Sequence, residues 1–203
     1  MKFQIVLLCL FFLVELNATP FYFKSYDMED GLSNNHVTCC VQDDYGFMWF
    51  GTRDGLNRFD SKKFYTFKSY SSEKGSLMSS YILDLAKSPT GQIWVSTNLG
   101  LQKYDYQTDS FTLIDFTKGI NCYSLQFDQQ GNLWMILNGY SLVKYNESQG
   151  MHLNYMYKGS DPITSFYITP QDQIWATTAN GNVVFLDLSL IHISEPTRLG
   201  MIS

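Results

Sequence analysis

Short runs in which hydrophobic and polar residues alternate follow one another along this chain, and Gly, Asp and Asn separate them. Alternation with a period of two is typical of strands that bury one face. Gly, Asp and Asn between two such runs favour tight hairpin turns. The first group of runs therefore predicts four antiparallel strands, at Val37 to Gln42, Phe47 to Thr52, Leu56 to Phe59 and Phe64 to Phe67.

The same group of four runs recurs along the chain, and one Trp occupies the same place in each copy. Trp49, Trp94, Trp134 and Trp175 are separated by 45, 40 and 41 residues. Four short strands per unit of about forty residues are typical of a β-propeller blade. A Trp repeated in the second strand would fill the space between successive blades. The sequence therefore predicts an all-β chain with about four four-stranded blades of a truncated ring.

Both ends of the chain depart from the repeat. Residues 1–18 contain Lys2, an apolar run from Ile5 to Val14 and the small residue Ala18 before Thr19, which is the order expected of a signal peptide. A buried N-terminal helix or an uncleaved anchor is the alternative. Residues 189–203 carry no repeat signature and resemble translated sequencing-adapter read-through, so we expect an artefactual tail there. The expected blades thus occupy residues 19–188.

One more strand is expected near the N-terminus, before the first repeat unit. Phe23 to Tyr26 repeats the four residues from Phe67 to Tyr70, which belong to the outer strand of the first unit and its exit. We expect this segment to supply an outer strand to the last blade, because closing the ring limits exposed sheet edges.

Composition narrows the class of protein. The chain of 203 residues is 45% hydrophobic and 16% aromatic, as expected for a soluble globular protein. A net charge of -5 without a cluster of Lys and Arg disfavours a nucleic-acid-binding surface. Cys39, Cys40 and Cys122 lie outside the expected signal and lack metal-site spacing, so we expect buried structural thiols and no metal.

The repeats resemble a known family. The units read Asp-x-x-Gly-x-(Met/Ile/Leu)-Trp-x-(Gly/Ser)-Thr and then Gly-Leu-x-(Arg/Lys)-(Phe/Tyr)-Asp, most clearly around Trp49 and Trp94. This pattern resembles the two-component regulator propeller repeat, and Asp30 to Val37 resembles that family's first-blade lead-in. Units three and four depart from the pattern, since Ile136-Leu137 replaces Gly-Thr and unit four lacks the second motif.

The resemblance implies a function. Members of the family use these repeats, typically in seven-bladed rings, as the periplasmic sensor of hybrid two-component histidine kinases, which detect oligosaccharides released from glycans. For this chain it implies the exported ligand-sensing portion of such a receptor, without the kinase, phosphorelay and DNA-binding parts. Its implied partners are an oligosaccharide, the remaining blades and signalling domains, and a second receptor in a homodimer. A freestanding secreted scaffold or lectin-like binder is the alternative.

An enzymatic function is a weaker hypothesis, although some propellers are hydrolases or lyases. Glycoside hydrolysis requires two carboxylates across a sugar, but most candidate carboxylates recur in the first hairpin, where turn formation explains Asp. No Gly-rich phosphate loop is present, and the three His residues lack a recognisable nucleophile partner. We therefore expect no catalytic residues and no cofactor. The carboxylates considered are Asp43, Asp44, Asp84, Asp128 and Asp172.

Binding residues are expected on the loops between the second and third strands. These loops and the connections between blades should gather on one face of a propeller. Side chains that differ between units are not required by the scaffold, and Asn, Arg and Tyr suit hydrogen bonding to and stacking on sugars. A solvated turn is the alternative for each of them. The expected ligand-binding residues are Arg53, Asp54, Asn98, Asn138, Tyr140 and Asn180, with Asn34, Asn35 and His36 in the first inter-blade loop.

Overall fold

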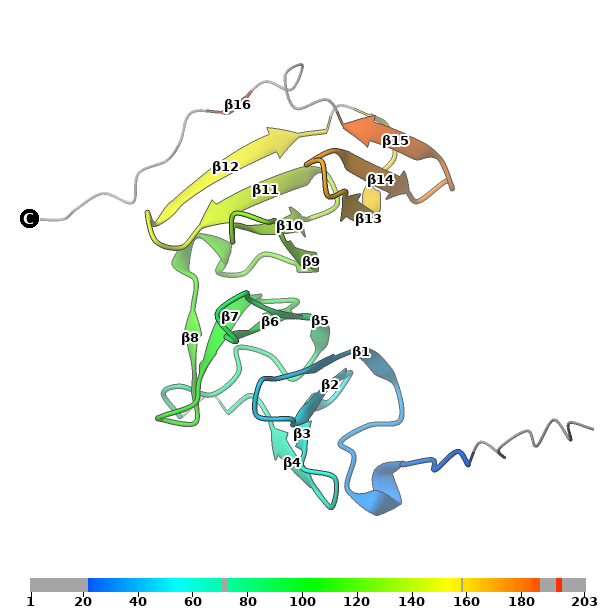
Figure 1. Ribbon diagram of the computed structural model, residues 1–203, viewed down its shortest axis with the longest axis vertical. Coiled ribbons are helices and arrows are strands. Elements are labelled where there is room, and N and C mark those ends of the chain that lie inside the picture. Colours follow the sequence, from blue (N-terminus) through cyan, green and yellow to red (C-terminus); the bar gives the residue numbers. More distant parts are fainter. Residues whose placement is uncertain (1–21, 71–72, 158, 187–192, 195–203) are drawn as a thin grey trace, which may run out of the picture.

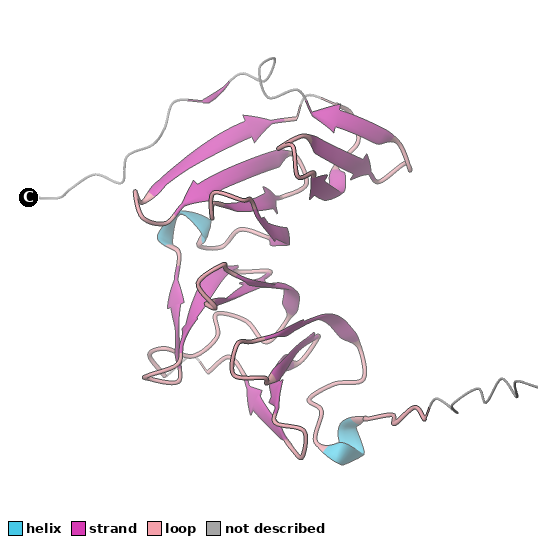
Figure 2. Cartoon of the chain, viewed as in Figure 1, coloured by secondary structure: helices cyan, strands magenta, loops and turns pink. Residues whose placement is uncertain are grey.

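The structure, a computed structural model, describes residues 22–70, 73–157, 159–186 and 193–194. Four antiparallel sheets follow one another in chain order along an open arc (Figure 1). The helices of the described chain are two single 3₁₀ turns, η1 (Met28–Asp30) and η2 (Asp115–Thr117) (Figure 2). The predicted all-β propeller architecture is confirmed.

The first two sheets, blades 1 and 2, have four strands each, in the order in which the strands occur along the chain. Tight turns join the strands, as the Gly, Asp and Asn pattern predicts. Blade 1 consists of β1 (Val37–Gln42), β2 (Met48–Thr52), β3 (Gly55–Phe59) and β4 (Phe64–Phe67). Blade 2 consists of β5 (Ile82–Lys87), β6 (Ile93–Thr97), β7 (Gly100–Asp105) and β8 (Ser110–Leu113).

The third and fourth sheets, blades 3 and 4, repeat this order with small differences. Blade 3 consists of β9 (Cys122–Phe127), β10 (Leu133–Leu137), β11 (Ser141–Asn146) and β12 (Met151–Met156), and β16 (Ile193–Ser194) pairs with β12 as a fifth strand. The described part of blade 4 has three strands, β13 (Ile163–Ile168), β14 (Ile174–Thr178) and β15 (Val183–Leu186).

The first strand of each blade lies next to the first strand of the following blade, as the contacts of β1 with β5, β5 with β9 and β9 with β13 show. The first strands of blades 1, 2 and 4 carry a register shift at the same place, for example between Val37 and Cys39. In blade 3 the shift lies further along the first strand, between Tyr123 and Gln126.

The residue paired with the Trp is the eighth before it in every blade, including Gln126 opposite Trp134. The register at the Trp is therefore the same in every blade. Ile136, which replaces a small residue, pairs with Tyr123, so blade 3 is one residue out of step with the other blades at that position.

Three of the four Trp side chains are buried between successive blades. Trp49 packs with Ile82 and Val95 of blade 2, and Trp94 packs with Met135 of blade 3. Trp134 packs in the same way with side chains of blade 4, among them Phe166 and Ala176. Burial of an aromatic side chain is a large apolar contribution to stability. The predicted role of the Trp as a wedge between blades holds at all three junctions.

The outer faces of the first and last described blades are only partly covered. Trp175 is 44% exposed, because the face on which it lies has no following blade among the described residues. On blade 1, Phe50, Phe59 and Tyr26 line an apolar depression of about 290 Å³ on the side away from blade 2. Each of these two faces thus lacks a neighbouring blade among the described residues.

The structure tests only part of what the sequence predicts for the two ends of the chain. The expected signal peptide, residues 1–18, and most of the expected artefactual tail lie outside the described residues. Tyr22 to Asp27 form no strand, and Phe23 is 95% exposed. Because no closing blade is among the described sheets, the N-terminal outer strand stays a prediction.

Candidate functional site

The turns between the second and third strands have a common construction in blades 1 and 2. In blade 1 the Thr52 hydroxyl donates to the Gly55 carbonyl at 2.9 Å and accepts from the Asp54 N–H at 3.1 Å. In blade 2 Thr97 makes the same two bonds, to Gly100 and from Leu99. The last residue of the second strand therefore fixes the turn. The two residues that follow it are free to differ between blades.

The loops between blades lie against these turns. The Arg53 N–H donates to the His36 carbonyl at 3.3 Å, and the Asn138 N–H donates to the Asn121 carbonyl at 3.1 Å. In blade 4 the Ala179 N–H donates to Pro162 at 3.0 Å. The predicted site residues and the first inter-blade loop therefore lie along one edge of the propeller, which we call the turn edge.

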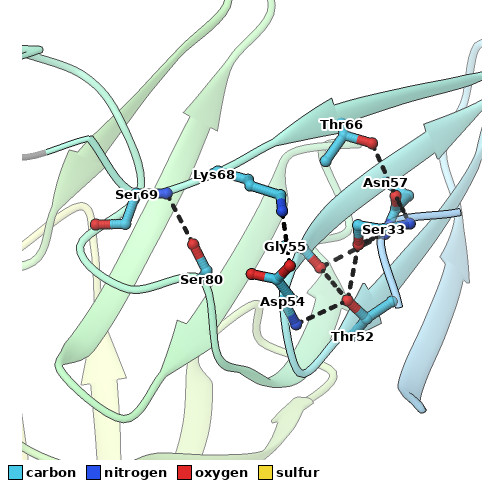
Figure 3. Close-up of polar contacts among 9 residues, drawn as sticks. All are labelled: Ser33, Thr52, Asp54, Gly55, Asn57, Thr66, Lys68, Ser69 and Ser80. Atoms are coloured by element: carbon cyan, nitrogen blue, oxygen red, sulfur yellow. Dashed lines mark hydrogen bonds and ion pairs between the residues drawn. The ribbon is translucent and has the colours of Figure 1, made fainter. Parts of the chain in front are cut away.

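A buried amide supports the turn edge in blade 1 (Figure 3). The Asn57 side-chain oxygen accepts from the Ser33 N–H at 2.9 Å and from the Thr66 hydroxyl at 3.0 Å, and its nitrogen donates to the Ser33 hydroxyl at 2.8 Å. Asn57 is fully buried, so these bonds replace the water it has lost. The amide thereby fastens the loop that enters blade 1 to the blade itself.

Arg53 and Asp54 form the exposed tip of this turn. The Asp54 carboxylate is 2.7 Å from the Lys68 ammonium, and both side chains are partly exposed (Figure 3). The Ser69 N–H donates to the Ser80 hydroxyl at 3.0 Å and ties the exit of β4 to the next connection. A solvated ion pair such as that of Asp54 with Lys68 contributes little to stability, so ligand contacts can replace it at small energetic cost.

Asn98 differs from the other predicted site residues because it is only partly exposed. Its side-chain oxygen is buried and accepts no hydrogen bond from the described residues. A buried acceptor without a donor is unfavourable by about 1–3 kcal/mol. A ligand hydroxyl or amide could supply the missing donor.

Asn138, Tyr140 and Asn180 complete the predicted set, and all three are exposed. Asn138 has a φ of +50°, a left-handed conformation that Asn tolerates better than most residues. Gly139 follows with a φ of +84°, and a Cβ there would lie 2.9 Å from the Pro162 side chain. Asn180 donates to the Asp161 carboxylate at 2.6 Å.

Within the described ranges, no side-chain hydrogen bond joins two of the six predicted turn residues. In the first inter-blade loop, the His36 N–H donates to the Asn34 side-chain oxygen at 2.8 Å, and the His36 carbonyl accepts from the Arg53 N–H.

The carboxylates considered for catalysis have structural partners. Asp43 and Asp128 are buried in first-hairpin turns and accept the indole N–H of Trp49 and Trp134. Asp84 accepts the Leu125 N–H of the next blade at 2.7 Å. Burial raises the pKa of Asp84, and two accepted backbone hydrogen bonds oppose that shift. These residues act in turns and at blade junctions.

The thiols and acidic residues give no sign of a metal site. Among the described residues, no group of three or more His, Cys, Asp or Glu is arranged to hold a metal ion. Cys122 is buried as expected, whereas Cys40 is exposed, so the expectation of buried thiols is wrong there. Burial raises the pKa of Cys39 and of Cys122 to about 12, which keeps both as unreactive thiols.

Sequence reasoning missed the residues that support the turn edge. Asn57 in blade 1 and Gln102 in blade 2 occupy the same place in the third strand, and Gln102 accepts the Met78 N–H at 2.7 Å. The signal was available, because both polar residues follow a Leu at the same place in the repeat. Their burial was not visible without the blade-to-loop packing.

Comparison with known proteins agrees with the architecture. Residues 31–54 match a family model described as two component regulator propeller. A protein named Histidine kinase P4, from Formosa agariphila, is 46% identical over 67 residues, which are 32% of this chain and 5% of that protein.

Solved structures share the fold. The extracellular domain of a hybrid two component system from B. thetaiotaomicron has a TM-score of 0.62 and 20% identity, over 86% of this chain and 32% of that one. A second such domain from the same organism has a TM-score of 0.64 and 21% identity, over 78% of this chain and 22% of that one. A virginiamycin B lyase from Staphylococcus aureus has a TM-score of 0.59 at 13% identity, over 83% of this chain and 60% of that one.

The repeats and the sheets define the class: this chain is an array of β-propeller blades, and residues 31–54 within it match the two component regulator propeller model. The resemblance to the two-component regulator propeller family is thereby confirmed. The chain spans 5% of the kinase it matches and about a third or less of the two extracellular domains. Within the described residues, no helix is long and apolar enough to cross a membrane.

Proposed function

We propose that this chain is the extracytoplasmic ligand-sensing portion of a hybrid two-component receptor, and that it recognises a glycan-derived oligosaccharide at the turn edge. The observation that carries the proposal is the contrast between constant scaffold and variable tips. Thr52 and Thr97 build equivalent turns, while the tips present Arg53 and Asp54 in one blade and Asn98 in the next. Blades 3 and 4 add Asn138, Tyr140 and Asn180 to the same edge.

The chemistry of these tips suits a sugar. Amides and a guanidinium offer directional hydrogen bonds to hydroxyl groups, and the 42% exposed ring of Tyr140 offers a face for stacking on a pyranose. Export follows from the proposed signal peptide, and the extracellular origin of the structural neighbours supports it. In the receptor, further blades, signalling domains and a second copy would be the partners, and ligand binding would change how the paired receptors dock.

The experiment is binding of an oligosaccharide panel to the intact receptor, followed by alanine variants at the turn edge. We expect Arg53→Ala, Asn138→Ala and Tyr140→Ala each to weaken binding of the oligosaccharide that the panel identifies. Lys62→Ala, Gln149→Ala and Tyr65→Ala, which lie on the opposite edge or the outer strand of a blade, should leave binding unchanged. Unchanged binding in all three turn-edge variants would remove this site.

The genomic sequence downstream separates the proposal from the secreted scaffold or lectin-like binder. A reading frame that continues into more Trp-centred repeats, a membrane helix and a kinase supports the receptor. An early natural stop codon supports the freestanding binder. Release of sugar from a glycan by the chain would favour a propeller hydrolase instead.

A further inference from the structure

The three complete blade junctions differ in what accepts the indole N–H of the wedge Trp. At the junction of blades 1 and 2, Trp49 donates to Asp43 at 2.7 Å, and at the junction of blades 3 and 4, Trp134 donates to Asp128 at 2.9 Å. Each Asp lies six residues before its Trp. At the junction of blades 2 and 3 the corresponding residue is Ser88. The Trp94 side chain is 1% exposed, and its N–H has no acceptor in the part of the chain that the structure describes.

A second substitution opens space at the same junction. Between blades 1 and 2, the residue directly after the third strand is Tyr106, whose hydroxyl donates to Asp43 at 3.1 Å and whose ring packs 4.9 Å from that of Tyr45. Between blades 2 and 3 its counterpart is Glu147, and the counterpart of Tyr45 is Thr90. The side chains of Asp43, Tyr45 and Tyr106 thus have the smaller counterparts Ser88, Thr90 and Glu147 at this junction.

A pocket of about 360 Å³ occupies the space that these substitutions vacate. Ser88, Thr90 and Glu147 line it together with Trp94, and Phe127 and Tyr145 add aromatic walls. At the other two junctions the indole N–H points to the residue six positions before the Trp. The same direction at Trp94 aims its buried N–H at Ser88, which lines the pocket. The volume lies within the range of pockets that hold small molecules.

The charges at the neighbouring junction of blades 3 and 4 indicate the class of ligand. Lys144 of blade 3 lies 3.1 Å from the Asp128 carboxylate, so that carboxylate accepts from both an indole and an ammonium group. Lys103, the counterpart in blade 2, lies over Trp94 and pairs with Glu147 instead. A carboxylate that entered beside Ser88 would supply the missing acceptor and take Lys103 as its counterion.

We propose that the pocket between blades 2 and 3 binds a small organic carboxylate with a ring or polyhydroxylated body, such as a uronate. Its carboxylate accepts the Trp94 N–H beside Ser88, and its body rests against Phe127 and Tyr145. The pocket is lined by the first-hairpin and third-to-fourth-strand turns, whereas the turn edge is formed by the second-to-third-strand turns, so this site is separate from the proposed oligosaccharide site.

The test follows the indole N–H resonances of the full chain by NMR, with Trp94 assigned by triple-resonance experiments. The probes are D-glucuronate, acetate and neutral D-glucose at constant ionic strength. We expect glucuronate to shift the Trp94 resonance downfield in a saturable way, acetate to do so more weakly, and glucose to leave it in place. No saturable shift with glucuronate, or an equal shift with glucose, would overturn the proposal.

Two variants and a control make the test specific. Ser88→Asp supplies the carboxylate from the chain, so its Trp94 resonance should lie downfield without ligand and should not respond to glucuronate. Thr169→Asp, the same change in the equivalent turn of blade 4, should leave the titration unchanged. Glu147→Gln removes a competing negative charge and should tighten glucuronate binding several-fold. Weaker binding in Glu147→Gln, or an unaltered titration in Ser88→Asp, would contradict the assigned geometry.

Discussion

Trp134 donates its indole N–H to the Asp128 carboxylate across 2.9 Å, and the two residues are six positions apart in one hairpin. The other oxygen of Asp128 accepts the N–H groups of Gln130 and Asn132 within the turn. One buried carboxylate therefore shapes the first hairpin and satisfies the residue that wedges two blades apart. The Asp of the motif therefore has two structural roles: it forms the turn, and it accepts the indole N–H of the Trp.

Replacing this carboxylate should destabilise the chain. In Asp128→Ala the buried indole N–H and the turn N–H groups lose their acceptor, so we expect the free energy of unfolding to fall by about 1–3 kcal/mol. Urea denaturation measures the change. Asp44→Ala removes a 58% exposed carboxylate paired with Lys87, and its effect should stay within about 1 kcal/mol. Equal effects of the two variants would refute the structural role of Asp128.

The pH dependence of stability should carry the signature of Asp84. Because burial raises its folded-state pKa above the unfolded value, the folded chain binds this proton more tightly than the unfolded chain. The contribution of Asp84 to stability is therefore greatest below the unfolded pKa and is lost as the pH rises through the folded pKa. Relative to wild type, Asp84→Asn should gain stability as the pH increases over that interval.

Asp60 provides a control of opposite sign for Asp84. The backbone N–H groups of Lys63 and Lys62 lower the pKa of Asp60, so its contribution is present above the unfolded pKa and is lost as the pH falls through the folded value. Asp60→Asn should therefore lose stability relative to wild type as the pH rises. Chemical denaturation at a series of pH values measures both variants, and slopes of the same sign would contradict the assignment.

The buried amide of Asn57 should be essential for the entry of the chain into blade 1. Asn57→Leu keeps the volume but leaves the Ser33 N–H and the Thr66 hydroxyl without their acceptor, so we expect a loss of about 1–3 kcal/mol. Thermal unfolding measures this change. Asn182→Leu, the same change at an exposed position between β14 and β15, is the matched control and should be nearly neutral. A neutral effect of Asn57→Leu would show that the network contributes no stability.

The open face of blade 4 should promote self-association of this chain. Trp175 and Phe185 are 44% and 47% exposed and pack against each other with ring centroids 5.1 Å apart. Contiguous exposed apolar surface favours association. Trp175→Gln combined with Phe185→Gln should shift the chain toward monomer in sedimentation velocity experiments. Tyr22→Gln, which removes a 90% exposed ring outside the sheets, should not.

Much of the fold could be predicted because the chain repeats. The spacing of the four Trp residues predicted the blade count, and the burial of Trp49, Trp94 and Trp134 follows from their equivalent places between blades. Register at the Trp could be carried from unit two to unit three, because the residue that pairs with the Trp is the eighth before it in both units.

Ile136 takes the place of a small residue, and there the register differs. Gly51 in blade 1 pairs with Cys39. Ile136 pairs with Tyr123, one residue nearer the start of the first strand. A Cβ at Gly51 would lie 2.5 Å from the Cys39 sulfur, so this position does not accept a larger side chain in the register of blade 1.

The candidate sites could be predicted only in part. The turn-edge residues were found because turns are local and are marked by Gly and Asn. The pocket beside Trp94 was not predicted, although the sequence shows Ser88 at the position that Asp occupies in units one and three. Its existence depends on Glu147, which lies 59 residues further along the chain and reaches the junction only through the packing of blade 3 on blade 2.

Iodide quenching of tryptophan fluorescence tests the blade arrangement most directly. The structure places Trp49, Trp94 and Trp134 between blades and leaves Trp175 on an open face. At a concentration at which sedimentation velocity shows a monomer, we predict that iodide quenches one accessible fraction of the wild-type emission. This fraction should disappear in Trp175→Phe, while the remaining emission resists quenching. Equal quenching of all the emission, or an accessible fraction that persists in Trp175→Phe, would contradict the stacking of four blades around their Trp wedges.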